Sequence, residues 1–478
     1  MKHLLKYAFI IFLSVITLML ISCSNKKEND SKYYVSLQGN DANNGKINSP
    51  FRTIKKGTSV LTAGDTLIIK PGNYGYEYAI EINKNGTKEL PIVIMAEKKG
   101  AVTLNGPRKE GEVDGPDSLE DGTNGSAIII GNVSYVVIDG LHITNYLIGI
   151  DVGIWNDGLL KETVIKNKPH NVTIKNCTFE QNGKDGIQVF RVDSVLITNC
   201  TFISDFVMEK EDGESYPNAV QDYGCNFYSS TGSIVEDCYF FGAANQALSF
   251  KEGDKDCIAR RNIFEGALYT AIYFGQNKIV DNNEENKNPS CKNLLAEYNI
   301  VRGAKGFRVK SPIRADNVIN AIIRNNYFEG FDKTGLTSGI NIFDEAKGKI
   351  EIYNNIVAFS VDKEKSAGIG IADNLAIATK LNIHNNTFYH LAKDISGNLR
   401  SDDIYEKNII YKCKNSLHKD KRNFYGNPNF FNGEPKQLPI STFSVKPEFN
   451  LLYKKLTKQF FVGPQSNAKG FGIVSLPH

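Results

Sequence analysis

One lysine in this sequence stands at the end of a short segment whose pattern recurs, and its position would suit a catalytic base. Five segments share the pattern: GIQVF (186–190), GCNFY (224–228), ALSFK (247–251), AIYFG (271–275) and GFRVK (306–310). Each begins with Gly or Ala and then alternates apolar and polar residues, which is typical of a strand with one buried face. Lys251 closes the third segment and would lie on the outer face.

If these segments are neighbouring strands, their outward residues form two rows. The first row holds Gln188, Asn226, Ser249, Tyr273 and Arg308, and the second holds Phe190, Tyr228, Lys251, Gly275 and Lys310. Neighbouring strands lie about 4.8 Å apart, so Lys251 and Lys310 would stand about 10 Å from each other. This register requires a buried Phe250 and an outward Lys251, because a slip of one residue would turn an unpaired charged lysine into the apolar core.

The two rows predict a basic and aromatic patch on one sheet face. A single outward lysine is most often only a solvated side chain, and that interpretation stays open. Cations bind carboxylates and aromatic rings stack on sugar faces, so the patch also suits an acidic polysaccharide. The substrate-binding candidates are Lys310, Tyr228, Asn226, Gln188 and Ser249.

A second repeated phrase indicates the elements that must position this patch. Its copies include VTIKNCTF (172–179), VLITNCTF (195–202) and LNIHNNTF (381–388), and Cys177 and Cys200 stand 23 positions apart. A period of this size is typical of a solenoid. Each copy reads as two strands joined at a bend, where Asn tolerates the left-handed backbone. With the five segments as third strands, the sequence predicts an all-β parallel β-helix. Leucine-rich repeats have a similar period, but their LxxLxL pattern is absent.

Small residues recur at one inward position of this phrase and predict a ladder inside the solenoid. Its members are Cys177, Cys200, Cys238, Asn262, Asn299, Asn326, Asn355, Asn386 and Asn408. These cysteines are expected to be small buried residues. No Cys/His spacing of the zinc type is present.

The N-terminus is interpreted as a lipoprotein signal, residues 1–23. Two lysines precede an apolar stretch that ends in LISC (20–23), which resembles the bacterial lipobox with Cys23 as the lipidated residue. A plain transmembrane anchor is the alternative, although the apolar stretch is short for one. Residues 24–32 would then be a tether, and the protein is expected in the bacterial cell envelope, facing outside the cytoplasm at the outer membrane or cell surface.

The segment 33–74 resembles the N-terminal part of secreted parallel β-helix proteins, with a strand, a short helix and a GDT-containing strand. Phe51, Ile54 and Leu61 form one apolar face of that helix, which can cover the open end of the solenoid. The predicted organisation is a cap and first rungs over 33–125, the parallel β-helix over 126–425, and a closing segment over 426–478. The closing segment is expected to fold back over the last rungs.

At ALSFK the chain resembles polysaccharide lyase family nine, the pectate-lyase-like right-handed β-helix enzymes. The resemblance implies that Lys251 is the Brønsted base beside a bound calcium ion. Of the aspartates that this family places near its lysine, only Asp222 has a counterpart here. The insertion containing Asp205 and Asp212 offers further oxygen ligands for calcium, and its alternative interpretation is an exposed charged loop.

The leading hypothesis is therefore a lyase that cleaves a uronate-containing polysaccharide by β-elimination. Lys251 would remove the proton α to the carboxylate, Arg308, Lys310 or a metal would stabilise the enolate, and Tyr273 would protonate the leaving oxygen. Two cationic neighbours would favour the neutral, basic form of Lys251. The alternatives are a surface glycan-binding lipoprotein without catalysis and a glycoside hydrolase on the same fold.

Composition, the aligned outward rows and the absence of certain motifs argue against several other functional classes. Lys+Arg number 56 and Asp+Glu number 53, so no nucleic-acid partner is predicted. The aligned outward rows hold no aspartates for an inverting hydrolase, and no phosphate-binding or dinucleotide motif is present. The expected partners are an acidic polysaccharide and a membrane, reached through the lipid at Cys23, and the protein is expected to be a monomer.

Overall fold

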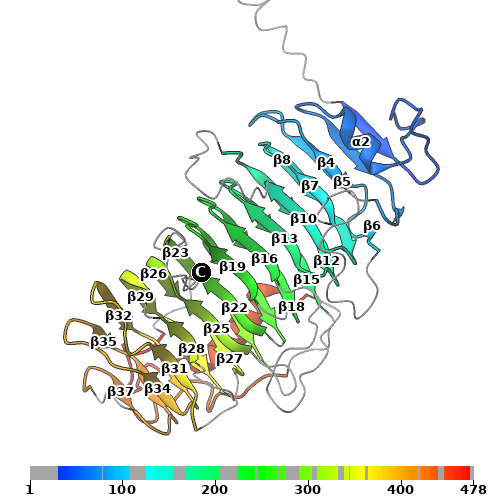
Figure 1. Ribbon diagram of the computed structural model, residues 1–478. Helices are drawn as coiled ribbons and strands as arrows, with labels where there is room; N and C mark the ends of the chain where they lie inside the picture. Colours follow the sequence, from blue (N-terminus) through cyan, green and yellow to red (C-terminus); the bar gives the residue numbers. More distant parts are fainter. Residues whose placement is uncertain are drawn as a thin grey trace, which may run out of the picture.

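The computed structural model describes the chain as a solenoid of three parallel sheets. It describes residues 31–77, 79–107, 125–153, 168–204, 223–242, 246–266, 268–275, 290–303, 309–331, 338–343, 345–360, 364–416, 420–439 and 446–473. Figure 1 shows the strands stacked along one axis, from the blue end beside α2 to the orange end beside β37. The predicted parallel β-helix is confirmed.

Sheet 1 has 13 strands, each paired in parallel with its neighbour. Its strands are β1 (Lys32–Val35), β2 (Thr66–Ile69), β5 (Ile92–Ala96), β8 (Val136–Asp139), β11 (Val172–Lys175), β14 (Leu196–Thr198), β17 (Ile234–Glu236), β20 (Ile258–Arg260), β23 (Cys291–Glu297), β26 (Val318–Arg324), β29 (Lys347–Tyr353), β32 (Thr379–His384) and β35 (Ile404–Glu406).

Sheet 2 has 11 strands and carries four of the five segments singled out in the sequence. Its strands are β4 (Ile80–Ile82), β7 (Ser126–Ile130), β10 (Ile148–Gly153), β13 (Asp185–Phe190), β16 (Tyr223–Tyr228), β19 (Gln246–Lys251), β22 (Leu268–Phe274), β25 (Val309–Ala315), β28 (Ser338–Ile342), β31 (Ala367–Ile371) and β34 (Lys393–Ser396).

Sheet 3 has 13 strands and follows sheet 1 within each turn of the chain. Its strands are β3 (Gly72–Asn73), β6 (Val102–Asn105), β9 (Leu141–Thr144), β12 (Thr178–Glu180), β15 (Thr201–Ile203), β18 (Tyr239–Phe241), β21 (Ile263–Glu265), β24 (Ile300–Arg302), β27 (Tyr327–Glu329), β30 (Ile356–Ala358), β33 (Thr387–Tyr389), β36 (Ile409–Tyr411) and β37 (Phe424–Tyr425).

The bend between sheets 1 and 3 is built by the left-handed residue that the repeated phrase predicts. Asn176, Asn199, Asn325 and Asn385 all have φ between 53° and 58°. Asn and Asp adopt this region more readily than most residues. One turn of the solenoid is therefore β11, the bend at Asn176, β12, and then β13 in sheet 2.

The predicted interior ladder is present, and it is held together by amide hydrogen bonds. The Nδ2 atom of Asn326 donates to Oδ1 of Asn355 at 3.0 Å, and that of Asn355 donates to Oδ1 of Asn386 at 3.0 Å. The series runs from Asn262 and continues one rung beyond the prediction, to Asn423. Each amide also donates to a backbone carbonyl, so these buried polar groups are satisfied. The ladder cysteines Cys177, Cys200 and Cys238 are buried thiols without disulfides.

A short helix covers the N-terminal end of the solenoid. Helix α2 (Ile54–Val60) is capped by the Thr53 hydroxyl and buries Ile54, with Phe51 and Leu61 also buried beside it. This is the apolar face that the sequence predicts, and it contacts the first strands.

The C-terminal segment reaches much further than the last rungs. It contains α3 (Phe449–Thr457) and the 3₁₀ turn η3 (Lys458–Phe460), and in Figure 1 its red trace runs back behind the middle of the solenoid. Tyr453 donates to the carbonyl of Asn325 at 2.6 Å, and Lys446 donates to Oδ1 of Asn199 at 2.6 Å. The physical reason is the apolar outer face of sheet 3, where Tyr239, Ile300 and Tyr327 pack with the C-terminal Leu456 and Phe460. Within the described residues, no helix is long and apolar enough to cross a membrane.

Candidate functional site

Four of the five predicted strands lie in the register that the sequence indicates. In sheet 2, Gln188 pairs with Asn226, Asn226 with Ser249, and Ser249 with Tyr273. Their neighbours Val189, Phe227, Phe250 and Phe274 are all buried in the core. The outward row of strands β13, β16, β19 and β22 is therefore confirmed.

The alignment of the fifth strand is wrong by six residues. Tyr273 pairs with Arg314, and Ile272 pairs with Ile313, so the strand next to AIYFG is SPIRA (311–315) and not GFRVK. Pro312 makes SPIRA less typical of a β-strand. GFRVK, in contrast, has the Gly and the alternating apolar and polar residues of the other four segments. Arg308 lies outside the described residues, and the side chain of Lys310 is not described. The cationic position in the row is held by Arg314.

Lys251 lies on the outer face of sheet 2, beside Tyr228 on the preceding strand. Its Nζ atom is 5.7 Å from the ring centroid of Tyr228 and 6.0 Å from that of Tyr273. These are cation–π distances. The expectation of an open, accessible lysine is nevertheless wrong, because only 3% of Lys251 is exposed. Alternation along a strand identifies the face of the sheet, but it does not show what covers that face.

Beyond Tyr273, an arginine and a buried carboxylate complete a cluster. The Tyr273 hydroxyl donates to Oδ2 of Asp316 at 2.5 Å, and Nε of Arg314 donates to the same oxygen at 2.8 Å. The guanidinium carbon of Arg314 lies 5.2 Å from the Tyr273 ring centroid and 4.3 Å from that of Phe343. The Asp316 carboxylate thus fixes both a phenolic hydroxyl and a cation on adjacent strands.

The predicted binding residues on the other side of Lys251 form a hydrogen-bonded group. The Nδ2 atom of Asn226 donates to the hydroxyl oxygen of Tyr228 at 2.7 Å, and the Ser249 hydroxyl donates to Oδ1 of Asn226. Gln188, Asn226 and Ser249 are buried, whereas Tyr228 is half-buried. We call the outer-face residues Asn226, Tyr228, Ser249, Lys251, Tyr273, Arg314 and Asp316 the central cluster.

Sequence reasoning missed two further features of this outer face. Arg314 and Asp316 were missed because the alignment of their strand was wrong. Asp151 continues the same row one strand before Gln188. It is 5% exposed, its Oδ1 has no hydrogen-bond partner among the described residues, and burial raises its pKa to about 7 although Lys184 opposes the shift. The alternating segment IGIDVG (148–153) contained the signal for Asp151.

Several predicted ligands cannot be placed. Asp205, Asp212, Asp222 and Cys23 lie outside the described residues, so calcium binding and lipidation stay predictions. Among the residues whose positions are described, no group of three or more His, Cys, Asp or Glu side chains could hold a metal ion.

Comparison with known proteins agrees with the fold. Residues 33–238 match the family model described as Pel9A-like, right handed beta helix region. Over these residues the chain is similar to the pectate-lyase-like right-handed β-helix proteins. The matched region ends before Lys251, so the family model does not include the centre of the cluster.

Two curated relatives match parts of the chain. Pectate lyase PEL9 of Emericella nidulans is 28% identical over 117 residues, which are 24% of this chain and 28% of that protein. The uncharacterized protein YwoF of Bacillus subtilis is 27% identical over 107 residues, which are 21% of this chain and 22% of that protein. The alignments thus span about a quarter of the length of these relatives.

Solved structures with similar architecture share little sequence with this chain. The lacto-N-biosidase of family GH136 from Eubacterium ramulus has a TM-score of 0.47 at 16% identity, covering 83% of this chain and 68% of that one. Pectate lyase Pel9A has a TM-score of 0.44 at 14% identity, covering 78% of this chain and 80% of that one.

Proposed function

We propose that this protein is a polysaccharide-active enzyme, and specifically a lyase that cleaves a uronate-containing polysaccharide by β-elimination. The observation that carries the proposal is the central cluster. In it, Lys251 lies between the rings of Tyr228 and Tyr273. Arg314 pairs with Tyr273 from the strand after it. β-Elimination needs a base for the proton at C5, a cation for the carboxylate and a proton donor for the leaving oxygen. Lys251, Arg314 and Tyr273 are chemically suited to these three roles.

In the proposed reaction, neutral Lys251 takes the C5 proton and the electron pair moves into an enolate on the carboxylate. Arg314 stabilises that negative charge. The enolate collapses to form the C4=C5 double bond, the C4–O bond breaks, and Tyr273 gives its proton to the leaving oxygen. The Tyr273 phenolate is then reprotonated by solvent, while Lys251 returns its proton to water. Asp316 acts as a positioning residue because it holds both Tyr273 and Arg314.

Calcium, the lipid anchor and the envelope location belong to the same proposal. Calcium would be held by acidic residues of the segment that contains Asp205, Asp212 and Asp222, and it would supply further charge for the substrate carboxylate. Anchoring through Cys23 would place the enzyme outside the cytoplasm, where extracellular polysaccharides are found. Removing calcium with a chelator tests the metal, and mass spectrometry of the mature N-terminus tests the lipid anchor.

The burial of Lys251 favours a second candidate function. With 3% of its surface exposed, Lys251 must become accessible before it can act as a base. A surface glycan-binding protein would need no such step and would use the same outer face of sheet 2. Incubation of the purified protein with pectins, alginate, ulvan and glycosaminoglycans, followed by chromatography and absorbance of the unsaturated product, separates the two. Binding without any cleavage, with calcium present, would assign the binding function.

A further inference from the structure

A separate pocket lies on the outer face of sheet 2, towards the C-terminal end of the solenoid. It lies over strands β28, β31 and β34 and has a volume of about 290 Å³. This is near the lower end of the range for small-molecule sites, about 300–1,000 Å³. The pocket therefore has room for one sugar unit.

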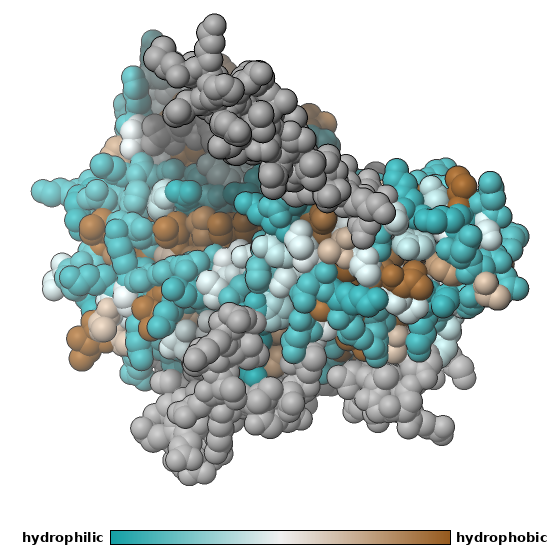
Figure 2. Space-filling model, turned by 90° about the horizontal axis from the view of Figure 1, so that it is seen from above, coloured by the Kyte–Doolittle hydropathy of each residue, from teal (hydrophilic) through white to brown (hydrophobic). Residues whose placement is uncertain are grey.

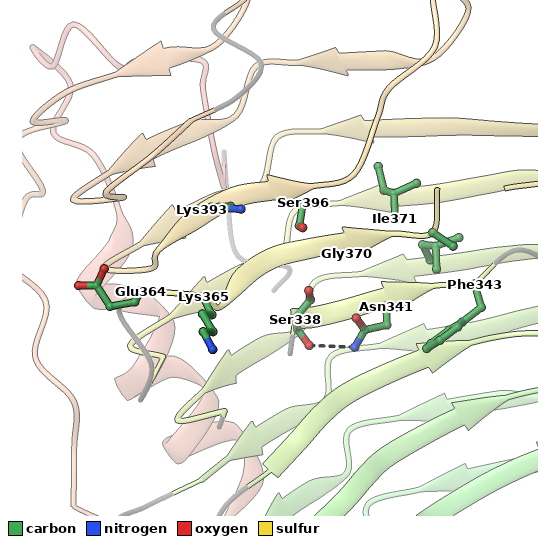
Figure 3. Close-up of a pocket in the computed structure, with 11 residues that line it drawn as sticks. Ser338, Asn341, Phe343, Glu364, Lys365, Gly370, Ile371, Lys393 and Ser396 are labelled. Atoms are coloured by element: carbon green, nitrogen blue, oxygen red, sulfur yellow. Dashed lines mark hydrogen bonds between the residues drawn. The ribbon is translucent and has the colours of Figure 1, made fainter. Parts of the chain in front are cut away.

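The lining of the pocket has three chemically distinct parts (Figure 3). Lys365 and Lys393 lie at one end, and Phe343 and Ile371 lie at the other. The polar groups of Ser338, Asn341 and Ser396 lie between these ends. A charged end, a polar floor and an apolar wall match the carboxylate, the hydroxyls and the C–H face of a uronic acid.

The charged end favours an anion. The Lys393 ammonium makes no hydrogen bond or ion pair with the described residues, although it lines the pocket. Glu364 also borders the pocket, and its carboxylate is paired with Lys414. The lysines therefore outnumber the single acid, and a carboxylate that enters would gain charge-assisted hydrogen bonds.

The floor of the pocket depends on a glycine. Gly370 pairs with Asn341 and Ser396 in the outward row that also contains Tyr273 and Arg314. A Cβ atom at Gly370 would lie 2.5 Å from the Ser338 hydroxyl oxygen and 2.8 Å from Oδ1 of Asn341. The Nδ2 atom of Asn341 is fixed because it donates to the Ser311 hydroxyl oxygen at 2.7 Å. A larger residue at position 370 would therefore fill the space above these polar groups.

We infer that this pocket binds one carboxylate-bearing sugar unit, a uronate, at a position remote from Lys251. Strands β19 and β28 are three rungs apart, about 14 Å, and the outward row connects them. The stacking of Arg314 on Phe343 joins the pocket wall to the central cluster. The inference rests on the proposed function only in taking this unit to be part of the polysaccharide that is cleaved.

The test is a titration of the whole protein with free glucuronate and galacturonate. Binding is monitored through the NMR signals of the δ1-methyl groups of Ile342 and Ile371. Glucose and galactose at the same ionic strength are the neutral controls. We expect saturable shifts with the uronates only, and affinity about tenfold weaker in Lys393→Gln. Gly370→Ala should also abolish the shifts. Lys380→Gln changes an exposed lysine of β32 in sheet 1 and should bind as the wild type does.

Three results would overturn the inference: no saturable shift, equal shifts with the neutral sugars, or unchanged uronate affinity in Lys393→Gln. The last comparison does not depend on whether Gly370→Ala folds. Because free uronates are not cleaved, the titration is independent of catalysis. Lys251→Met should keep this binding even if it loses activity, so failure of the pocket and failure of the lyase proposal can be told apart.

Discussion

The outer faces of sheets 2 and 3 both pair an arginine with buried carboxylates, yet the two faces are built differently. On sheet 3, Arg302 donates to Glu265 at 2.8 Å and to Glu329 at 2.7 Å. Its remaining Nη2 donates to the carbonyl of Leu438 at 2.5 Å. The C-terminal segment seals this ion cluster, which is an internal interface of the protein.

On sheet 2, the arginine shares a single carboxylate with a tyrosine and stacks on aromatic rings. Arg314 and Tyr273 both bond Asp316, and Lys251 lies between two tyrosine rings. The part of the C-terminal segment that is described packs on sheet 3. Figure 2, which views the molecule from above, shows a surface that is mostly hydrophilic, with bands of apolar residues between polar ones. The sheet 3 cluster shows that buried charged residues alone do not identify an active site. The central cluster of sheet 2 suggests one because its cations and aromatic rings outnumber its carboxylates.

The largest stability effect is expected for the sheet 3 cluster. Arg302→Met would leave Glu265 and Glu329 buried without their cation, and breaking a buried ion pair in this way costs about 3–5 kcal/mol. Chemical denaturation measures this loss. Activity per folded molecule should stay unchanged, and a selective loss of activity would contradict a purely structural role for Arg302.

The buried carboxyl of Asp151 should make stability depend on pH. Burial raises its pKa to about 7, above the unfolded value, so the folded state binds more protons between about pH 4 and pH 7. Stability should therefore fall as pH rises through this window. Asp151→Asn should remove the part of that fall that Asp151 contributes and be more stable than the wild type at pH 8, by a few kcal/mol at most. Denaturation at pH 5 and pH 8 measures the difference, and parallel pH profiles would contradict the prediction.

A smaller stability effect is expected at the counterpart arginine of sheet 2. Arg314 has 16% of its side chain exposed, so Arg314→Met should cost about 2 kcal/mol, within the range of about 1.5–3 kcal/mol for a hydrogen bond to a charged group. The cleavage rate should nevertheless fall strongly, because the carboxylate of the substrate loses its cation. Arg302→Met is the matched control, and an Arg314→Met enzyme that is unstable but fully active per folded molecule would reverse the roles assigned to the two faces.

At Tyr273, removing only the hydroxyl should separate chemistry from binding. Tyr273→Phe keeps the ring that contacts Lys251 and loses the proton donor, so kcat should fall about 10²-fold or more with KM little changed. The matched control is Tyr228→Phe, which should affect kcat less. Equal effects of the two substitutions would show that Tyr273 has no special role.

Much of the fold was predictable because each turn repeats the same physical requirements. The left-handed Asn, the inward amide and the alternating apolar residues are local signals, and they gave the ladder from Asn262 to Asn408 and four strands of sheet 2 correctly. The apolar helix face at Ile54 was an equally local signal. These features need no knowledge of distant contacts.

The site was only partly predictable because its remaining features depend on non-local contacts. GFRVK satisfies the strand pattern as well as SPIRA does, and only pairing with β22 decides between them. The enclosure of Lys251 depends on what lies over the sheet, which alternation cannot report.

The central claim is that the outer face of sheet 2 around Lys251 carries out β-elimination. The most direct measurement is the release of unsaturated product, read as absorbance of the C4=C5 double bond, by the wild type, Lys251→Met and Lys380→Gln on each acidic polysaccharide of the panel. The account predicts cleavage of at least one polymer by the wild type and by Lys380→Gln, and a fall of about 10³-fold in Lys251→Met with its melting temperature preserved. Cleavage by Lys251→Met at the wild-type rate, or no unsaturated product from any polymer with the wild type, would contradict it.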